Sequence, residues 1–397
     1  MIALDHPASQ DSLHFLQAAP RHPEDRGQVA LLLATSDHSG VVTVMRRLAE
    51  AWLGLGVAVD LLHIEHHGPD PAIMPPGLRL VALGCRHVAT AGPGLRRYLR
   101  AHAPQALLVD KHRLNLLALE AARACAVPTR VCLRTGTAVL ADLDQYGPWR
   151  RMRVRRAITR RYGRAHAVIV PSAGIAADLL ELGVPRSKVQ VIPNPIATSD
   201  LDRLAAEPLA HPWFQPGEPP VVLGVGELCA RKDFLTLLEA AHLAARSTPL
   251  RLMILGEGSQ RAHLEQRAQA LDWADHVALP GFAANPYPFM RQAAMVVLPS
   301  RLEGFGNVLV EAMHLGTPLI ATDCPHGPGE ILDHGRLGTL VGVGDVQAMA
   351  EAILATLAQP PDRQRLRAAA TRYDMATNAR RYLEVMGLAQ AQAMETI

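Results

Sequence analysis

The sequence predicts an α/β protein whose two parallel-sheet domains face a cleft. Its 397 residues are enough for two domains, because domains usually hold roughly 100–200 residues. Short apolar runs alternate with helical segments through most of the chain, which is typical of mostly parallel sheets. A proline-rich stretch over residues 193–220 separates two such series. Ligands of such sheets bind at the carboxyl ends of the strands, so the loops after the strands are the candidate sites.

The N-terminal half opens with VALLLA, a continuous apolar run typical of a buried parallel strand. Residues 1–27 lack a basic start and a continuous apolar stretch, so we expect a loose leader rather than a secretion signal. Strands are expected at Val29–Ala34, Ala58–His63, Leu78–Leu83, Ala106–Asp110, Arg130–Leu133 and Ala167–Val170. Helices are expected at Val41–Leu55, Leu114–Ala126 and the arginine-rich segment Trp149–Arg164.

The alternation restarts after the proline-rich stretch. Strands are expected at Val221–Val225, Leu250–Leu255, His276–Leu279, Met295–Leu298 and Leu319–Thr322. Helices are expected at Phe234–Ala245, Arg261–Ala270 and Val308–His314. We therefore predict a first domain over residues 28–198, a linker over 199–220 and a second domain over 221–374. A closing helix over 375–397 is expected to return to the first domain.

The composition argues against several classes of protein. Lysine and arginine number 40 against 37 acidic residues, which is too balanced for a typical nucleic-acid binder. The five cysteines include no C-x-x-C pair, so a disulfide framework or a zinc site is not expected, and a reducing cytoplasm fits. No apolar run is long enough for a membrane span. We expect a cytoplasmic protein with no metal and no bound cofactor.

Two glycine pairs suggest a dinucleotide site, but neither completes the pattern. Gly224 and Gly226 follow a strand, yet Cys229 stands where the third glycine is needed. Gly256 and Gly258 also follow a strand, with Arg261 in the third place. Because that fingerprint needs its glycines for the turn and for the approach of the pyrophosphate, an NAD-type site is not predicted.

The strongest local pattern is PSRLEGFGNVLVEAMHLGTP, residues 299–318, which follows the apolar run MVVL. Gly304 and Gly306 allow the backbone to approach a ligand closely. The N–H groups of residues 306–308 are expected at the start of a helix, where donors and the helix dipole attract phosphate. Glu311 falls about one turn into that helix, where its carboxylate can accept the two hydroxyls of a ribose. The alternative is a glycine-rich turn with two solvated glutamates, Glu303 and Glu311.

A second pattern, ELCARKDF at residues 227–234, lies between a strand and a helix. Arg231 and Lys232 precede the expected helix start, and Asp233 is a plausible N-cap. Cations at a helix N-terminus are unfavourable unless an anion lies there too, and a diphosphate would be such an anion. The alternative is a solvated basic loop.

Together these segments resemble the donor domain of retaining glycosyltransferases of family four, which have the GT-B fold of two Rossmann-like domains. The resemblance runs from Ala167 to Asp345 and includes VIVPSAGIAADLLELGVPRSKVQVIPNPI, GVGELCARKDFLTLLEAA and LMILGEGSQRAHLEQRAQ. It is most specific in the two glutamates of residues 299–318. NPYPFM and DCPHGPGEIL resemble a bacterial branch that builds cell-surface polysaccharides such as lipopolysaccharide. The N-terminal half is similar in layout only.

The resemblance implies roles for individual residues. Arg231 and Lys232 would grip the donor diphosphate, and Glu303 would face the transferred sugar as a catalytic residue. Glu311 would bind the ribose. The remaining donor-binding positions would be Gly304, Phe305 and Gly306 around the sugar, Asn307 and Val308 at the phosphates, and Gly40 in the loop of the first domain.

The chain departs from the family pattern at three places. Glu227 stands where many members carry arginine, so Arg231 is expected to supply that charge. The first-domain loop has Ser39-Gly40 in place of paired glycines. Arg134 stands where a histidine often follows the strand, which makes it the candidate residue on the acceptor side.

The resemblance implies transfer of a hexose or N-acetylhexosamine from a nucleotide diphosphate sugar, with UDP favoured over GDP. The acceptor would be lipid-linked or a polysaccharide, and the anomeric configuration would be retained. The nucleotide sugar is a substrate, not a cofactor. Two alternatives stay open: a nucleotide-sugar epimerase of the same two-lobed fold, and a non-catalytic nucleotide-sugar sensor.

The segment WRRMRVRRAITRRYGR, residues 149–164, suggests a further partner. Val154, Ile158 and Tyr162 recur at helical spacing among the arginines, and a basic helix with an apolar side suits an anionic membrane surface. The inner face of the cytoplasmic membrane is the surface expected. The alternative is a solvated helix whose apolar side packs on its own domain. The arginines are Arg150, Arg151, Arg153, Arg155, Arg156, Arg160, Arg161 and Arg164.

Overall fold

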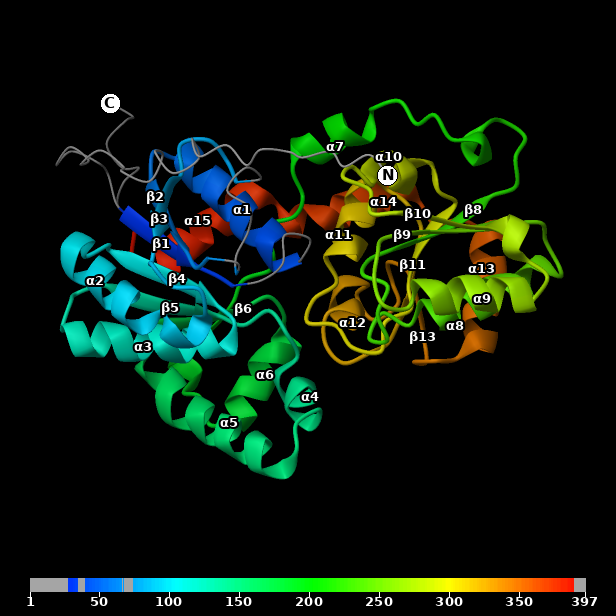
Figure 1. The fold of residues 1–397 in the computed structure, drawn as a ribbon. Coiled ribbons are helices and arrows are strands. Elements are labelled where there is room, and N and C mark those ends of the chain that lie inside the picture. The colour runs from blue at the N-terminus through cyan, green and yellow to red at the C-terminus, as the bar shows by residue number, and fades with distance from the viewer. Residues whose placement is uncertain (1–27, 35–39, 66, 68–73, 389–397) are drawn as a thin grey trace, which may run out of the picture. The chain divides into compact units, whose positions relative to one another are not determined.

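The computed structural model describes residues 28–34, 40–65, 67 and 74–388 (Figure 1). The predicted leader, residues 1–27, lies outside this part of the chain. The chain divides into two compact units. The first comprises residues 1–134, 164–168 and 383–397, and the second comprises 135–163 and 169–382.

The first parallel sheet has the strand order β3-β2-β1-β4-β5-β6-β7. Its inner strands are continuous apolar runs with buried side chains, as parallel strands covered on both faces require. The strands are β1 (Gln28–Leu32), β2 (Ala58–His63), β3 (Arg79–Ala82), β4 (Ala106–Asp110), β5 (Arg130–Arg134), β6 (Ala167–Val170) and β7 (Val189–Val191). The sequence predicted each of these except β7, a short strand with exposed and half-buried side chains and therefore little apolar signal.

Helices alternate with these strands in the chain. Helix α2 packs against α3, and α1 buries Trp52 and Leu48 in the core. Ser172 directly precedes helix α6, and its hydroxyl accepts a hydrogen bond from the Ile175 N–H at 3.3 Å, an N-cap contact. The helices are α1 (Gly40–Gly54), α2 (Gly92–His102), α3 (His112–Cys125), α4 (Val139–Asp144), α5 (Pro148–Arg161), α6 (Ala173–Glu181) and α7 (Ser199–Ala205).

The second parallel sheet has the strand order β10-β9-β8-β11-β12-β13. Its strands are β8 (Val221–Val225), β9 (Arg251–Leu255), β10 (Val277–Gly281), β11 (Met295–Leu298), β12 (Leu319–Thr322) and β13 (Thr339–Val341). Its helices are α8 (Phe234–Ala245), α9 (Arg261–Ala270), α10 (Tyr287–Gln292), α11 (Asn307–His314), α12 (Pro328–Ile331), α13 (Val346–Ala358), α14 (Arg363–Ala370) and α15 (Met375–Val385).

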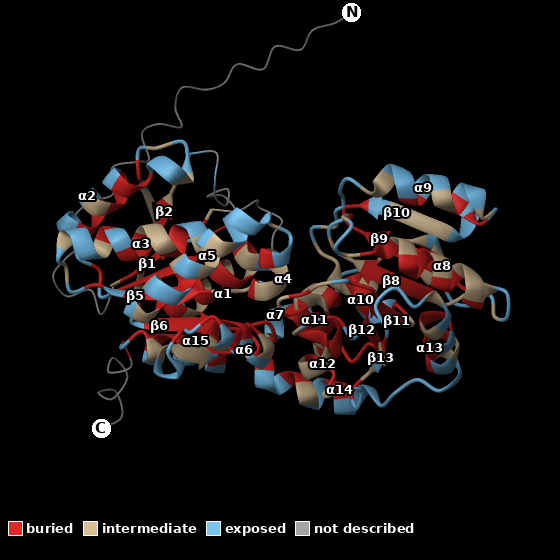
Figure 2. Cartoon of the chain, turned by 90° about the horizontal axis from the view of Figure 1, so that it is seen from below, coloured by how far each residue is buried: buried red, intermediate tan, exposed pale blue. Residues whose placement is uncertain are grey.

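The core of the second sheet is mostly aliphatic. Helices α8 and α13 pack together over it, and leucine, isoleucine, valine and alanine fill most of the space. Phe234 and Trp273 are its two aromatic side chains. Buried strands run beneath helices that expose their outer faces (Figure 2). The predicted α/β class with two parallel sheets is therefore confirmed.

The two sheets each contain a point where the strand order reverses. In the second sheet β8 leads to β9 and β10 on one side, while its other neighbour β11 leads to β12 and β13. In the first sheet the same reversal lies between β1 and β4. Ligands in open α/β sheets bind beyond the carboxyl ends of the strands at such switch points. A ligand of the second sheet is therefore expected at the loops after β8 and β11.

The segments at the two predicted domain boundaries contain a helix, a short turn and a hydrogen bond to the first sheet. The predicted linker, residues 199–220, contains α7 and a short 3₁₀ turn at Pro212–Phe214. At the other boundary, the carbonyl of Gly387 accepts a hydrogen bond from Arg130 Nη1 at 3.0 Å within the first unit.

Candidate active site

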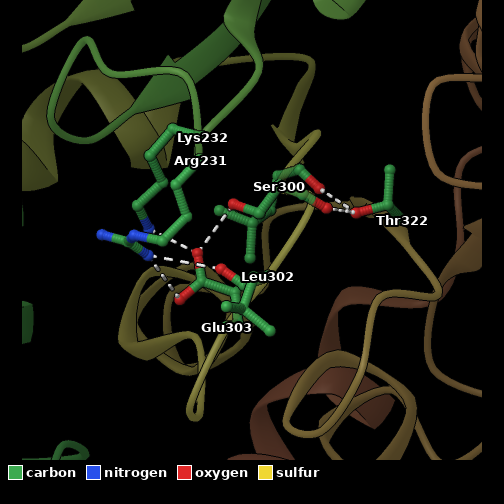
Figure 3. Close-up of polar contacts among 7 residues, drawn as sticks. Arg231, Lys232, Ser300, Leu302, Glu303 and Thr322 are labelled. Carbon is green, nitrogen blue, oxygen red and sulfur yellow. Dashed lines mark hydrogen bonds and ion pairs between the residues drawn. The ribbon is translucent and has the colours of Figure 1, made fainter. Parts of the chain in front are cut away.

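Glu303 lies in the loop that follows β11, and its side chain is only 7% exposed. The Ser300 hydroxyl donates a hydrogen bond to Glu303 Oε1 at 2.7 Å (Figure 3). Ser300 is itself fully buried, and its carbonyl accepts a hydrogen bond from the Thr322 hydroxyl at the end of β12. The position of the Glu303 carboxylate is therefore fixed by residues at the carboxyl ends of two neighbouring strands, β11 and β12.

The predicted basic loop after β8 meets Glu303 directly. Lys232 Nζ donates to Glu303 Oε1 at 2.5 Å, and Arg231 Nη1 lies 3.7 Å from Oε2 (Figure 3). Arg231 also donates to the Leu302 carbonyl at 3.3 Å. These contacts form because β8 and β11 are hydrogen-bonded neighbours, so their carboxyl ends open on the same edge of the sheet. The structure thus brings together the two patterns that the sequence singled out.

The charges around Glu303 decide its protonation. Burial alone would raise the pKa of Glu303, but the charges of Lys232 and Arg231 and the hydrogen bonds from Lys232 and Ser300 outweigh it. The pKa of Glu303 therefore lies below the usual 4.5, and the carboxylate is ionised at neutral pH. Burial, followed by the charge of Glu303, raises the pKa of the nearby Cys324 thiol to about 11, so this cysteine is neutral.

Helix α11 starts at Asn307, one residue earlier than predicted, directly after Gly306. Gly306 has φ of 100°, a left-handed conformation that glycine adopts without strain and that lets the chain turn sharply into the helix. Amides at the start of a helix have no acceptor within it and can bind an anion. In α11 the Leu309 N–H already donates to the Gly306 carbonyl at 2.9 Å, so the amides expected to meet an anion are those of Asn307 and Val308. Asn307 is fixed at this terminus by Asn194, whose side-chain amide donates to its Oδ1 at 2.8 Å.

Glu311 lies in α11 and is 7% exposed. The Tyr287 hydroxyl donates to Glu311 Oε1 at 3.4 Å from the start of α10. This burial excludes the alternative in which Glu303 and Glu311 are two solvated glutamates of a surface turn, since Glu303 is also buried.

Gly304 has a reason to be glycine that the sequence did not reveal. A Cβ on this residue would lie 1.9 Å from the carbonyl oxygen of Gly136. Similarly, a Cβ on Gly327 would lie 1.9 Å from the carbonyl oxygen of Phe305. The loop after β11 is therefore packed between two other backbone segments, and larger residues at these two glycines would displace it.

Asp233 occupies the N-cap position of α8, as predicted, but its side chain makes no capping hydrogen bond. Its φ is 50°, in the left-handed region, which turns the carboxylate away from the first amides of the helix. The carboxylate instead accepts from the Thr236 hydroxyl at 2.9 Å and pairs with Arg301 at 2.9 Å. The interpretation of Asp233 as a capping side chain was wrong.

In the first unit, Gly40 is the first residue of α1, while Ser39 lies outside the described residues. Arg134 is the last residue of β5, and its side chain is 2% exposed. Its guanidinium pairs with Asp110 at the end of β4, and its carbonyl accepts from the Asn115 amide at 3.1 Å. The charge of Arg134 is therefore balanced inside the sheet, and its part in binding an acceptor stays a prediction.

Sequence reasoning missed Ser300, Arg301 and Tyr287. Ser300 and Arg301 stand between a buried strand and Glu303, a position that could have drawn attention to them. Tyr287 gave no signal, because it reaches Glu311 from the start of a different helix, α10.

No group of three or more histidine, cysteine, aspartate or glutamate side chains that could hold a metal is found among the described residues. The chain has two Asp-x-Asp triplets, at Asp142–Asp144 and Asp200–Asp202. In the second, Asp202 pairs with His314 at 3.0 Å and with Arg367 at 3.7 Å.

The fold and this site define a class of protein. Residues 39–195 match the family model described as "Glycosyl transferase 4-like domain". Residues 209–373, which include Lys232, Glu303 and Glu311, match the model described as "Glycosyl transferases group 1". The chain is built as a glycosyltransferase of the GT-B type. More particularly, its second half matches the group 1 glycosyltransferases, and the chain is similar to curated glycosyltransferases named for lipopolysaccharide core biosynthesis.

Two curated relatives match about half of the chain. The chain is 32% identical over 199 residues to "Lipopolysaccharide core biosynthesis glycosyltransferase LpsE" of Rhizobium meliloti, covering 50% of this chain and 56% of the relative. It is 29% identical over 189 residues to the "N-acetylgalactosamine-N,N'-diacetylbacillosaminyl-diphospho-undecaprenol 4-alpha-N-acetylgalactosaminyltransferase" of Campylobacter jejuni, covering 47% of this chain and 50% of the relative. The alignments thus span about half the length of these relatives.

Solved structures extend the likeness to most of the chain. The apo form of the lipopolysaccharide outer core galactosyltransferase WaaB superposes with a TM-score of 0.71 at 17% identity, over 91% of this chain and 99% of that one. Anabaena Alr3699/HepE, in complex with UDP and glucose, superposes with a TM-score of 0.71 at 19% identity and the same coverage. At these identities the likeness shows the fold.

Proposed function

We propose that the chain is a retaining glycosyltransferase of family four. It would move a hexose or an N-acetylhexosamine from a nucleotide diphosphate sugar to a lipid-linked or polysaccharide acceptor. The observation that carries the proposal is the contact of Lys232 and Arg231 with Glu303 at the strand-order reversal of the second sheet. Two cations that could bind a diphosphate, Lys232 and Arg231, lie there next to a carboxylate that could face a sugar, that of Glu303.

The reaction needs stabilisation of the leaving group. The bond between the anomeric carbon and the diphosphate oxygen breaks, and the diphosphate gains negative charge. Lys232, Arg231 and the first-turn amides of α11 would stabilise that charge, which is electrostatic catalysis by fixed groups. The acceptor oxygen attacks from the face that the diphosphate leaves, and its proton passes to the departing phosphate. This route retains the anomeric configuration without a nucleophile from the protein.

The choice of donor rests on the relatives. HepE was solved with UDP and glucose, and the Campylobacter relative is named for transfer of N-acetylgalactosamine to a diphospho-undecaprenol. These names support a UDP-sugar over a GDP-sugar, and a lipid-linked glycan as acceptor. Glu311, buried beside Tyr287, would bind the ribose hydroxyls of the donor.

A donor screen tests this proposal. The purified chain is incubated with a panel of UDP- and GDP-sugars, and released nucleoside diphosphate is measured. We expect slow release from one UDP-sugar, and proton NMR should show that the sugar first appears with the donor's anomeric configuration. Release of the opposite anomer would contradict retention, and release from no nucleotide sugar would contradict the proposal.

The same experiment separates the two alternatives. An epimerase would convert the nucleotide sugar into its isomer without an acceptor, which NMR of the unreleased donor detects. A sensor would bind nucleotide sugars without consuming them. The presence of Lys232 and Glu303 together favours transfer over sensing. We further propose that no metal takes part, so activity should survive a chelator, and strong inhibition by EDTA would contradict this.

We also propose that helix α5 meets an anionic membrane surface at the cytoplasmic leaflet. Arg150, Arg151, Arg153, Arg156 and Arg160 of α5 are exposed, as is Arg164 just after it, and Trp149 is 77% exposed. A shallow hollow of about 410 Å³ lies along the helix between Pro148 and Arg160. Arginines near an anionic surface contribute about 1 kcal/mol each, and tryptophan favours the membrane interface.

The apolar side of this helix follows the alternative that the sequence left open, in which it packs on the protein itself. Ile158 and Tyr162 are buried, so that side packs inside the protein, and Trp149 is the apolar group left for a membrane. No helix in the described ranges is long and apolar enough to cross a bilayer. The proposed contact is therefore electrostatic, with one aromatic anchor.

Co-sedimentation with vesicles tests the contact. Binding should require anionic lipid and fall steeply with salt. Replacing Arg153, Arg156, Arg160 and Arg164 by glutamine should abolish it. The control replaces Arg246, Arg291, Arg363 and Arg365, four exposed arginines of the second unit, and should leave it intact. Equal loss in both variants, or equal binding to neutral vesicles, would contradict a role of α5.

A further inference from the structure

A second ion pair joins the two loops of the candidate site, and it uses neither Lys232 nor Glu303. Arg301 Nε lies 2.9 Å from Asp233 Oδ2. The Arg301 N–H also donates to the Arg231 carbonyl at 2.9 Å. Arg301 stands two residues before Glu303, and Asp233 directly follows Lys232. This pair therefore links the loop after β8 to the loop after β11 beside the reacting groups.

The backbone at Asp233 is unusual in a way that serves this pair. Its φ of 50° is uncommon for a residue with a side chain, and aspartate is one of the few that tolerate it. Its side chain is 8% exposed and is committed to Arg301 and to the Thr236 hydroxyl rather than to the helix amides. Because Lys232 is the preceding residue, the turn at Asp233 sets the direction in which the Lys232 side chain leaves the loop.

The pair matters most when a donor is bound. Without one, Lys232 itself ties the loops together through Glu303 at 2.5 Å. Under the proposed function, Lys232 binds the diphosphate and Glu303 faces the sugar, so the contact between these two side chains is lost. Asp233 and Arg301 have no partner in the donor under that proposal, and their contact can persist. It would then be a side-chain contact between the two loops that does not depend on the groups holding the donor, and it would keep Lys232 in register with Glu303.

We propose that Arg301, acting through Asp233, is a positioning residue that holds Lys232 against the donor diphosphate. The inference rests on the proposed function and adds a determinant that touches neither the sugar nor the nucleotide. Arg301 is 59% exposed, so it is not needed to fill the core. Its loss should alter the site and leave the fold intact.

The test compares Arg301→Ala and Arg301→Lys with the control Arg336→Ala, which removes an exposed arginine paired with Asp333 at 3.2 Å. Misplacement of a catalytic group by about 1 Å can cost a hundredfold in rate, so we expect Arg301→Ala to lower kcat roughly tenfold to a hundredfold. The donor KM should change less. Arg301→Lys should recover part of the rate, because its ammonium can still pair with Asp233. The control should match wild type.

A double variant isolates the path through Lys232. If Arg301 acts by positioning Lys232, Arg301→Ala should cost nothing further in a Lys232→Ala background. Equal losses in both backgrounds would overturn the proposal, because they would show that Arg301 acts independently of Lys232. Unchanged kinetics of Arg301→Ala would overturn it too.

Hydrogen exchange supplies a readout that needs no donor. Amides of residues 227–234 should exchange faster in Arg301→Ala than in wild type, with the rest of the chain unchanged. Unaltered exchange in this segment overturns the proposed link. Faster exchange together with a wild type that binds no nucleoside diphosphate would instead overturn the proposed function and, with it, the part of the inference that concerns the donor.

Discussion

Replacing Glu303 by glutamine should change nucleotide affinity and turnover in opposite directions. In the free protein the Glu303 carboxylate accepts from Lys232 at 2.5 Å, with Arg231 at 3.7 Å from the other oxygen. Both cations are also the groups proposed to grip the donor diphosphate. A nucleoside diphosphate must therefore compete with Glu303 for them, and it meets the negative charge of Glu303 as well. Glutamine removes both obstacles.

The magnitude follows from the burial of the pair. Lys232 and Glu303 are 12% and 7% exposed, so water and salt screen their attraction little. A hydrogen bond to a charged group contributes about 1.5–3 kcal/mol. Glutamine can still accept from Lys232, so part of this is kept. A gain of about 1.4 kcal/mol, or a tenfold lower Kd for the nucleoside diphosphate, is expected.

Turnover should fall because glutamine lacks the charge that would face the transferred sugar. Positive charge develops on a sugar as its glycosidic bond breaks, and a carboxylate stabilises it. Loss of one such preorganised electrostatic contact costs about a hundredfold or more in kcat. The variant should thus bind product more tightly and turn over more slowly.

The assay is titration calorimetry with UDP, paired with steady-state rates on the best donor of the screen. A melting temperature from a thermal scan shows that the variant is folded, since breaking a buried pair can destabilise by about 3–5 kcal/mol. Glu351→Gln, an exposed surface position, is the matched control. Weaker UDP binding by Glu303→Gln would refute the competition, and unchanged kcat would refute the placement of Glu303 at the sugar.

Three further predictions test other parts of the account. Lys232→Ala should lower kcat/KM by a factor that corresponds to roughly 2–4 kcal/mol of lost transition-state stabilisation, because it removes the positive charge beside the departing diphosphate. Near-normal kinetics would reject that role. Glu311→Ala should mainly weaken UDP binding in calorimetry, and an unchanged Kd would leave Glu311 as a structural residue of α11. Burial, followed by the charge of Arg113, lowers the pKa of His112 from 6.5 to about 4. The folded protein therefore prefers neutral His112, and up to roughly 3 kcal/mol of stability, present above pH 6.5, should be lost between pH 6.5 and 4. Urea unfolding of wild type and His112→Gln should diverge over that range, and parallel curves would contradict it.

Much of the fold was predictable because parallel strands are buried on both faces. Strands such as Ala106–Asp110 and Met295–Leu298 are uninterrupted apolar runs with ends marked by polar residues. The short strand β7 escaped prediction because its residues are not fully buried. Helix α5 was predicted from the helical spacing of Val154, Ile158 and Tyr162, but whether that side packs inward depends on tertiary contacts that a helical period does not contain.

The candidate site was predictable where one segment holds its parts. Gly306, the start of α11 and Glu311 follow from a single stretch of sequence. The contact of Lys232 with Glu303 could be suspected only from the resemblance, because the two residues are 71 positions apart. The conformation of Asp233 overrode its usual capping tendency, since Arg301 and Thr236 offer its carboxylate better partners. Gly304 is dictated by Gly136, which no local pattern connects to it.

The central claim is that a nucleotide diphosphate sugar binds where the loops after β8 and β11 meet. The most direct test is calorimetric titration of UDP and GDP into wild type, the Lys232→Ala/Glu311→Ala double variant and the control Lys188→Ala, which changes a lysine outside this site. The account predicts saturable binding of UDP to wild type and control, with no detectable binding to the double variant. Equal affinity in all three proteins, or no binding of either nucleotide to wild type, would contradict it.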